Sequence, residues 1–265
     1  YLTKPIDPHE ITARATVHLE REVMTKRLRE FNLRMVNELE IARTTQNILI
    51  PSSSFISEME EAYKLQICSH YQSCSELGGD FWGIKSLSNE ELAIYMVDFA
   101  GHGVNAALNV FRLHALMQAA MDTAKTPSAY LTYLNSILAP LLPTGQFATM
   151  FYGVINNKRN TLSYASAASP PAVLFSKQAS SHQLLDSTGT LLGAFRESVY
   201  KMEEVEFNAG DYLLLYSDAL IETQNASGEM LPIEYWLESF QTSLKGERGS
   251  CKHSFEVLLS DFNKK

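Results

Sequence analysis

The sequence predicts an α+β fold built on antiparallel sheets. Short segments of strand-like composition follow one another in hairpin-like runs, and turn residues such as Asn156-Asn157 and Ala209-Gly210 separate them. Helical segments cluster between and after these runs instead of alternating with single strands, which disfavours βαβ units. A long stretch without glycine, from Pro8 to Ile48, precedes all of them.

This first stretch predicts one long helix. Apolar residues recur along it in steps of three and four, which is the spacing of a coiled-coil seam with one stutter. The seam consists of Leu28, Phe31, Met35, Leu39, Ala42, Gln46 and Leu49. We expect residues 16–50 to form a coiled-coil linker that joins two copies into a homodimer. The alternative is an ordinary amphipathic helix packed on the domain that follows.

Pro51-Ser52-Ser53-Ser54 ends this helix and marks a domain boundary. Beyond it, alternating or continuous apolar runs predict strands at 65–71, 92–97, 148–155, 162–167, 172–175, 199–207 and 212–216. Residues 81–87 form a shorter, mixed run. Glycine-free segments rich in Ala, Leu and Met, or with helical apolar spacing, predict helices at 104–124, 128–138, 233–244 and 253–262.

The composition is that of a globular, cytoplasmic protein. The chain has 265 residues, 45% hydrophobic and 20% charged, and no apolar run approaches the length of a membrane span. Its three cysteines form no CxxC pair, which disfavours a zinc site or a disulfide scaffold. Net charge is -8. Residues 1–50 carry 8 basic and 7 acidic residues, so the remaining 14 and 23 give residues 51–265 a net charge of -9, which argues against nucleic-acid binding.

Two familiar chemistries fit poorly. Gly101-His102-Gly103 follows a strand and opens a helix, as in a dinucleotide-binding turn, but Asp98 just before it would repel a pyrophosphate. The acidic residue expected on a second strand is also missing. Cysteine phosphatase chemistry needs an arginine shortly after the nucleophile, and none stands at that spacing after any cysteine.

Three aspartates share a context that indicates a metal site. Asp80 follows Gly78-Gly79 at a strand start, Asp98 ends a buried strand, and Asp218 follows the strand 212–216. One such aspartate is usually a turn former or a helix cap. Three of the chain's eight in this context favour a convergent carboxylate cluster. Hard oxygen ligands suit Mg²⁺ or Mn²⁺, and two such ions can activate a water and neutralise a phosphoryl group.

At these residues the sequence resembles the SpoIIE/RsbU branch of the metal-dependent (type 2C) serine/threonine phosphatases. The matching segments occur in the right order over about residues 42–262: Gln46-x-x-Leu49-x-Pro51, Glu76-Leu-Gly-Gly-Asp-Phe81, Asp98-Phe-Ala-Gly-His-Gly-Val-Asn-Ala-Ala107, Phe147-Ala-Thr-Met-Phe151, Leu192-Gly193, Ala209-Gly210-Asp211 and Ser217-Asp-Ala-Leu-Ile-Glu222. Several motifs in order are far more specific than any one of them.

The resemblance implies an αββα sandwich, two antiparallel sheets flanked by helices, with a binuclear Mn²⁺ or Mg²⁺ centre at one edge. It makes Asp80, Asp98 and Asp218 the catalytic metal ligands, with the backbone carbonyl of Phe99 as a fourth donor. The implied substrate is a phosphoserine or phosphothreonine on a regulatory protein such as an anti-sigma-factor antagonist. The alternative is a phosphatase-like domain with decayed metal sites that binds a partner.

The sequence also departs from the family pattern. Ala168-Ser169 stands where Gly-His is frequent, and Ala219 stands where glycine usually follows the third aspartate. An acidic Asp-Asp-x-Thr element normally follows the last helix, and it is not found before Lys265. We therefore expect the phosphatase domain, 51–265, to lack its C-terminal end and to bind its second metal weakly. Asp261 and Glu222 are the first candidates for a substitute ligand.

For three further residues the sequence allows both a functional and a structural role. His102 is either a phosphate contact or general acid, or a loop histidine bonded to backbone. Glu76 and Arg112 have a structural interpretation that we prefer to a role at the metal or the phosphate. Residues 1–15, with Lys4-Pro5, resemble the end of a response-regulator receiver domain, which predicts control by a receiver upstream.

Overall fold

A computed structural model of the protein describes residues 8–73, 77–120, 125–177, 181–224, 228–244 and 251–262. The chain divides into two compact units, Tyr1–Thr45 and Gln46–Lys265. Helix α1 (Pro8–Asn47) forms the described part of the first unit and contributes its last two residues to the second. Lys4-Pro5 lies outside the described residues. None of the described helices is long and apolar enough to span a membrane.

The second unit contains two antiparallel sheets. Sheet A has the order β1-β2-β3-β4-β7 and consists of β1 (Asp80–Ser86), β2 (Glu91–Phe99), β3 (Ala148–Asn156), β4 (Thr161–Ala167) and β7 (Glu203–Glu206). Sheet B has the order β6-β5-β8 and consists of β6 (Ser181–Leu185), β5 (Ala172–Ser176) and β8 (Tyr212–Leu214). The predicted α+β fold with antiparallel sheets is therefore confirmed.

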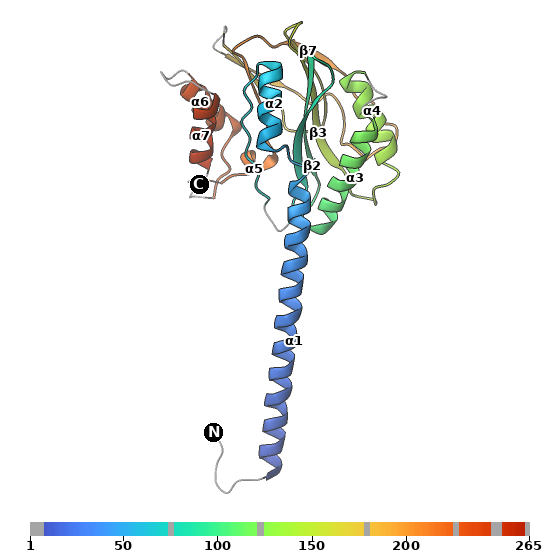
Figure 1. Ribbon diagram of the computed structural model, residues 1–265, viewed down its shortest axis with the longest axis vertical. Coiled ribbons are helices and arrows are strands. Elements are labelled where there is room, and N and C mark those ends of the chain that lie inside the picture. The colour runs from blue at the N-terminus through green and yellow to red at the C-terminus, as the bar shows by residue number, and fades with distance from the viewer. Residues whose placement is uncertain are drawn as a thin grey trace. The chain divides into compact units, whose positions relative to one another are not determined.

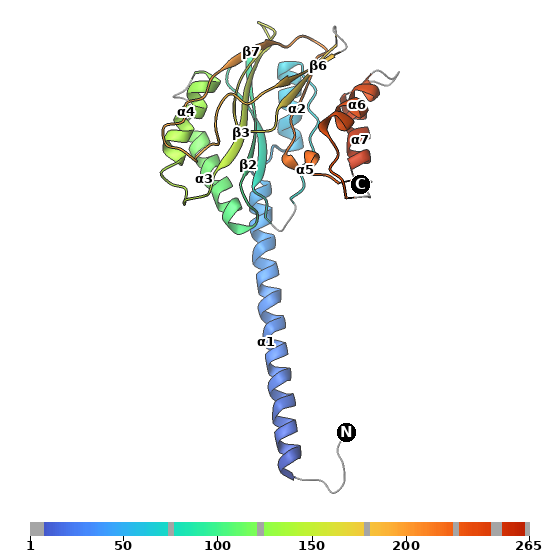
Figure 2. The ribbon, with the colours of Figure 1, turned by 180° about the vertical axis from the view of Figure 1, so that it is seen from behind.

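Helices flank the two sheets. Their bounds are α2 (Ser53–Tyr63), α3 (Val104–Ala120), α4 (Pro127–Leu138), α5 (Asp218–Ile221), α6 (Ile233–Leu244) and α7 (Cys251–Phe262). Figures 1 and 2 show α3 and α4 on one side of the strands, and α6 and α7 on the other. This layering is the αββα sandwich that the resemblance implied.

Alternation along β2 explains the layers. Tyr95, Val97 and Phe99 point to one face and pack with Leu113 of α3 and Leu134 of α4 in the largest core cluster. Residues between them point to the other face, toward sheet B and α2. There a second cluster joins the sheets, with Phe151, Leu162, Tyr164 and Leu174 at its centre. Because side chains alternate along a strand, Asp98 faces sheet B, away from α3.

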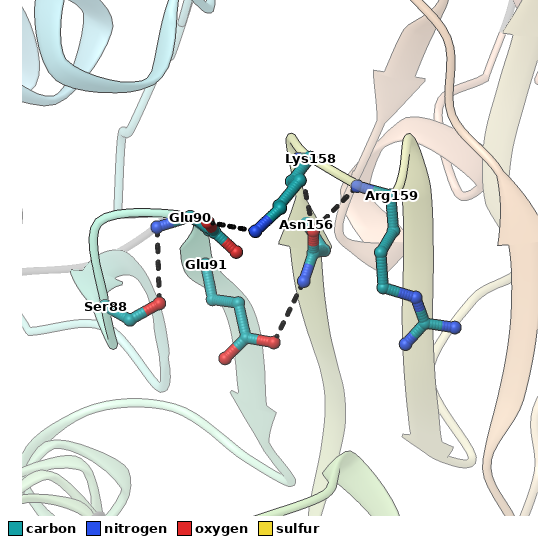
Figure 3. Close-up of polar contacts among 6 residues, drawn as sticks. All are labelled: Ser88, Glu90, Glu91, Asn156, Lys158 and Arg159. Atoms are coloured by element: carbon teal, nitrogen blue, oxygen red, sulfur yellow. Dashed lines mark hydrogen bonds and ion pairs between the residues drawn. The ribbon is translucent and has the colours of Figure 1, made fainter.

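The far end of sheet A is formed by two hairpin turns. Lys158 Nζ donates to Glu90 Oε1 at 2.9 Å, and Asn156 Nδ2 donates to Glu91 Oε1 at 3.1 Å, which links the two turns (Figure 3). Asn156 Oδ1 in turn accepts the backbone N–H groups of Lys158 and Arg159. Glu90, Glu91, Asn156 and Lys158 at this end therefore have partners within the protein.

Several predicted elements need correction. Residues 65–71 are extended but belong to no sheet, because Glu60 Oε1 accepts the Ile67 N–H at 2.7 Å in place of a neighbouring strand. The predicted strand 199–207 is reduced to β7. Helix α2, strand β6 and the single turn α5 were not predicted. Residues 121–124 of the predicted helix 104–124 lie outside the described part of the chain.

The seam of α1 is shorter than its spacing suggested. Leu28 and Phe31 are 60% and 58% exposed. Gln46 is buried instead, and Leu49 packs on the core of the second unit. These two residues satisfy the heptad spacing but serve the globular unit, so they are not available for a seam between two chains.

Candidate metal centre

Asp80 and Asp98 meet at one end of sheet A. Asp80 is the first residue of β1, Asp98 is the penultimate residue of β2, and the two are direct partners across the antiparallel pair. Directly opposed residues project to the same face of a sheet. Both side chains are half-buried and hydrogen-bond each other, so the two carboxyls predicted from separate motifs do come together.

The surroundings of this pair disfavour the ionised form of both carboxyls. Burial, the hydrogen bond to Asp80 and the charges of Asp80, Asp218 and Glu222 raise the pKa of Asp98 to about 8. Burial raises the pKa of Asp80 too; its bond to Asp98 opposes this rise and the charge of Asp218 adds to it. Two carboxyls at hydrogen-bonding distance hold a proton between them when no cation is present. A divalent cation would take that proton's place.

Asp218 reaches the same end of the sandwich from sheet B. It is the first residue of α5, shortly after β8, and it is exposed. Glu222 follows one turn later, and its backbone N–H donates to the Asp218 carbonyl at 2.9 Å. A small crevice runs between the sheets from Asp98 to Tyr216 and Ser217. The three predicted aspartates therefore share one edge of the sandwich.

The carboxyls do not yet form a closed coordination sphere. No three histidine, cysteine, aspartate or glutamate side chains among the described residues converge closely enough to hold one metal ion. Asp80 and Asp98 touch, whereas Asp218 and Glu222 act on them through charge. The donor set is all oxygen, which fits Mg²⁺ or Mn²⁺ better than zinc.

The carbonyl of Phe99 is held beside this pair by two glycines. A Cβ on Gly79 would lie 2.8 Å from the Phe99 carbonyl oxygen and 3.1 Å from that of Gly101, so only glycine fits. The Gly79 carbonyl also accepts the Phe99 N–H at 3.2 Å. Gly-Gly before Asp80 is thus a packing requirement that brings the backbone of Phe99 close to the start of β1.

Gln46 fixes the same turn from the other side. Its side chain is 3% exposed, its Nε2 donates to the Gly78 carbonyl at 2.7 Å, and its Oε1 accepts the Gly78 N–H at 3.1 Å. Both backbone groups of a residue two positions before Asp80 are therefore held by one amide. Sequence reasoning placed Gln46 in the seam and missed this role, although a polar residue in an apolar seam was a signal.

The other predicted residues that the structure describes do not join the site. Arg112 donates to Asn109 Oδ1 at 2.9 Å and to the Leu141 carbonyl at 3.1 Å, which supports its structural interpretation. His102 is exposed in the loop before α3. Asp261 Oδ2 accepts the Ser239 hydroxyl, between α7 and α6. Glu76 lies outside the described residues.

Ala168-Ser169 retains an unusual backbone. Ala168 has φ +52°, a left-handed conformation that favours glycine. Its N–H is bonded to Ser187 Oγ at 2.8 Å, and the hydroxyls of Ser166 and Ser169 lie 2.8 Å apart. Alanine therefore occupies a backbone conformation that favours glycine, next to Ser169 of the crevice.

The chain was compared with models of known protein families. The family model described as Stage II sporulation protein E (SpoIIE) matches residues 88–264, more than half of the chain. The chain belongs to the SpoIIE family. The match includes Asp98, the Gly101–Gly103 turn and Asp218, and the segment with Gln46 and Asp80 lies just before it.

Two curated relatives of this SpoIIE-family chain are phosphoserine phosphatases from Bacillus subtilis. RsbP is 27% identical over 197 residues, which cover 73% of this chain and 47% of RsbP. RsbU is 27% identical over 237 residues, which cover 89% of this chain and 69% of RsbU. The chain thus spans about half the length of one relative and about two thirds of the other.

Among solved structures, the SiaA-PP2C domain of Pseudomonas aeruginosa has a similar fold. The TM-score is 0.74 at 18% identity, and the match covers 88% of this chain and 91% of that domain. At this identity the likeness concerns the fold alone. It identifies the sandwich of this SpoIIE-family chain as a PP2C fold.

Proposed function

We propose that this chain is a metal-dependent protein phosphatase that removes phosphate from phosphoserine or phosphothreonine on a regulatory protein. The observation that carries the proposal is the half-buried Asp80–Asp98 pair, joined by charge to Asp218 at one edge of a PP2C fold. Family membership and two phosphoserine phosphatase relatives favour this activity over a binding module with a dead site.

Mn²⁺ or Mg²⁺ would be held by Asp80 and Asp98, with Asp218 and the Phe99 carbonyl as further ligands, and a binuclear centre is the form that the resemblance implies. When bound, such ions supply an activated water and charge neutralisation for the phosphoryl group. The chain's own contribution is positioning. Gln46 and Gly79 fix the backbone just before Asp80, and the register of β1 and β2 sets the spacing of the two carboxyls.

The test is the metal dependence of turnover. The full chain is freed of metal with a chelator and assayed on p-nitrophenyl phosphate and on a phosphoserine peptide, before and after Mn²⁺ or Mg²⁺ is added. We expect no turnover without metal and turnover of both substrates with it. A chain that stays inactive with either metal would be the binding module instead.

The substrate we propose is an anti-sigma-factor antagonist, and its support is the likeness to RsbU and RsbP. Assays on a set of purified phosphoproteins distinguish specificity for such an antagonist from a general phosphoserine phosphatase activity. We expect turnover per enzyme to be at least tenfold faster on a phosphorylated antagonist of this class than on the phosphoserine peptide alone. Equal rates would indicate that nothing beyond the phosphoserine is recognised.

We also propose that residues 16–50 form a homodimeric coiled coil through the seam positions before Gln46. An upstream receiver domain, of which residues 1–15 are the end, would control it. The exposed Leu28 and Phe31 support the coiled coil. The change Leu28→Glu with Met35→Glu would place charges in the seam, and light scattering should then show monomers. Wild-type protein that is already monomeric would contradict the proposal.

A further inference from the structure

Two cysteine thiols meet from distant parts of the chain. Cys68 lies in the extended segment between α2 and β1, and Cys251 is the first residue of α7. Both are half-buried free cysteines, and their thiols hydrogen-bond each other. In Figures 1 and 2 the segment after α2 runs between α2 and the α6–α7 pair. No part of the proposed metal centre uses them.

The surroundings hold this contact in place. Glu60 Oε1 accepts the Ile67 N–H at 2.7 Å and so fixes the residue before Cys68. Burial, the hydrogen bond with Cys68 and the charges of Cys68 and Glu60 raise the pKa of Cys251 to about 12. Cys251 therefore stays a thiol at neutral pH, and as the hydrogen-bond donor it leaves the Cys68 sulfur as the acceptor.

We propose that Cys68 and Cys251 are an oxidative modification site at which hydrogen peroxide forms a disulfide. The Cys68 sulfur attacks one peroxide oxygen as its thiol gives up its proton, and the O–O bond breaks. The departing hydroxide takes up that proton, so a sulfenic acid and water result. The Cys251 sulfur then attacks the Cys68 sulfur, and the S–O bond breaks. The hydroxide leaves with the Cys251 proton as a second water. Two thiols are oxidised and one peroxide is reduced.

The bond would connect the two layers of the sandwich. Tyr71, three residues after Cys68, donates its hydroxyl to the backbone carbonyl of Asp80 at 3.2 Å, so this segment leads into the edge of sheet A. Helix α7 packs with α6 on sheet B. A cross-link over so long a stretch of chain stabilises the folded state by restricting the unfolded chain. We expect the melting temperature to rise by roughly 5–15 °C.

The experiment treats the full chain with excess hydrogen peroxide, followed by intact mass, non-reducing peptide mapping and melting with and without a reductant. We expect the loss of two hydrogens, a Cys68–Cys251 peptide, and a higher melting temperature that the reductant reverses. Cys74→Ser is the matched control and should behave as wild type. Cys251→Ser should form no cross-link.

Three outcomes would overturn the proposal. They are wild-type thiols that stay reduced or are oxidised only to sulfinic acid, a disulfide that involves Cys74, or a cross-link that persists in Cys251→Ser. If Cys251→Ser fails to fold, as judged by circular dichroism, the peptide map of the wild type and of Cys74→Ser decides alone. None of these measurements depends on phosphatase activity, so they stand apart from the proposed function.

Discussion

The two ends of sheet A treat negative charge in opposite ways. At the turn end, Glu90 pairs with Lys158 at 2.9 Å, and Glu91 accepts from Asn156 (Figure 3). Glu204 pairs with Arg159, also at 2.9 Å. At the other end, Asp80 and Asp98 face Asp218 and Glu222, and none of the ion pairs within the described residues involves them. At the turn end, these acidic side chains have partners within the protein. The other end requires a proton or a cation from outside.

We expect the largest effect on turnover from a substitution at the site end of β2, compared with one at the turn end of the same strand. Glu91 and Asp98 lie near opposite ends of β2. Asp98→Asn should lower metal-dependent turnover of p-nitrophenyl phosphate by more than about 100-fold, because it removes a charged ligand. The metal-free variant should melt at the same temperature as wild type or higher, because the amide stays neutral beside Asp80, Asp218 and Glu222 without having to bind a proton.

The control for this variant is Glu91→Gln, which keeps an oxygen for Asn156 and should leave turnover within about twofold of wild type. Similar losses in the two variants would show that the ends of β2 do not differ in function. Near-normal turnover in Asp98→Asn would remove this residue from the metal centre.

A second pair of variants tests the side-chain amides that hold the backbone at the two ends of sheet A. Gln46→Leu leaves the buried N–H and C=O of Gly78 without partners and should cost about 2–4 kcal/mol of unfolding free energy. Asn157 at the turn end donates to the Tyr63 carbonyl, and Asn157→Ala should cost about 1 kcal/mol. Urea denaturation measures both effects.

Mn²⁺ affinity separates the roles of these two side chains. Gln46→Leu should weaken Mn²⁺ binding, since Gly78 lies two residues before Asp80, and Asn157→Ala should not change it. Equal Mn²⁺ affinity in wild type and Gln46→Leu would mean that Gln46 only stabilises the fold.

The site end should also give the metal-free protein a pH dependence. The folded state holds a proton on Asp98 up to about pH 8, whereas the unfolded chain releases it near 3.8, so the folded state binds more protons between these values. This contribution to stability is complete below the lower value and is lost as pH rises through the higher. Melting with a chelator should therefore show stability falling over this window, and the fall should be smaller in Asp98→Asn. If stability falls equally steeply in that variant, a group other than Asp98 causes the pH dependence.

The smallest effect concerns the two flanks of β4. Asn160 at the turn end and Ala168 at the site end both have φ +52°. Asparagine tolerates this conformation and alanine does not. Ala168→Gly should therefore gain up to about 1 kcal/mol, and Asn160→Gly should change unfolding free energy by only a few tenths. A loss of stability in Ala168→Gly would show that the turn is unstrained.

The sequence predicted the parts of this fold that local patterns control. Apolar runs located β2, β3 and β5. The shared strand-end context of Asp80, Asp98 and Asp218 predicted that they lie near one another, and the structure has them at one edge of the sandwich. Prediction from the sequence failed where a single distant contact decides. Residues 65–71 alternate like a strand but are held by Glu60, and Gln46 has seam spacing but binds Gly78. β6 is exposed at four of its five positions, so it carries no apolar signal.

The most direct test of the central claim is calorimetric titration of the metal-free chain with Mn²⁺. Three proteins are compared: wild type, the double variant Asp80→Asn with Asp98→Asn, and the turn-end double variant Glu90→Gln with Glu91→Gln. We predict binding heat in the wild type and an equal heat in the turn-end variant, with none in the Asp80/Asp98 variant. Heat that persists without the two aspartates, or that disappears with the two glutamates, would contradict the assignment of the metal centre.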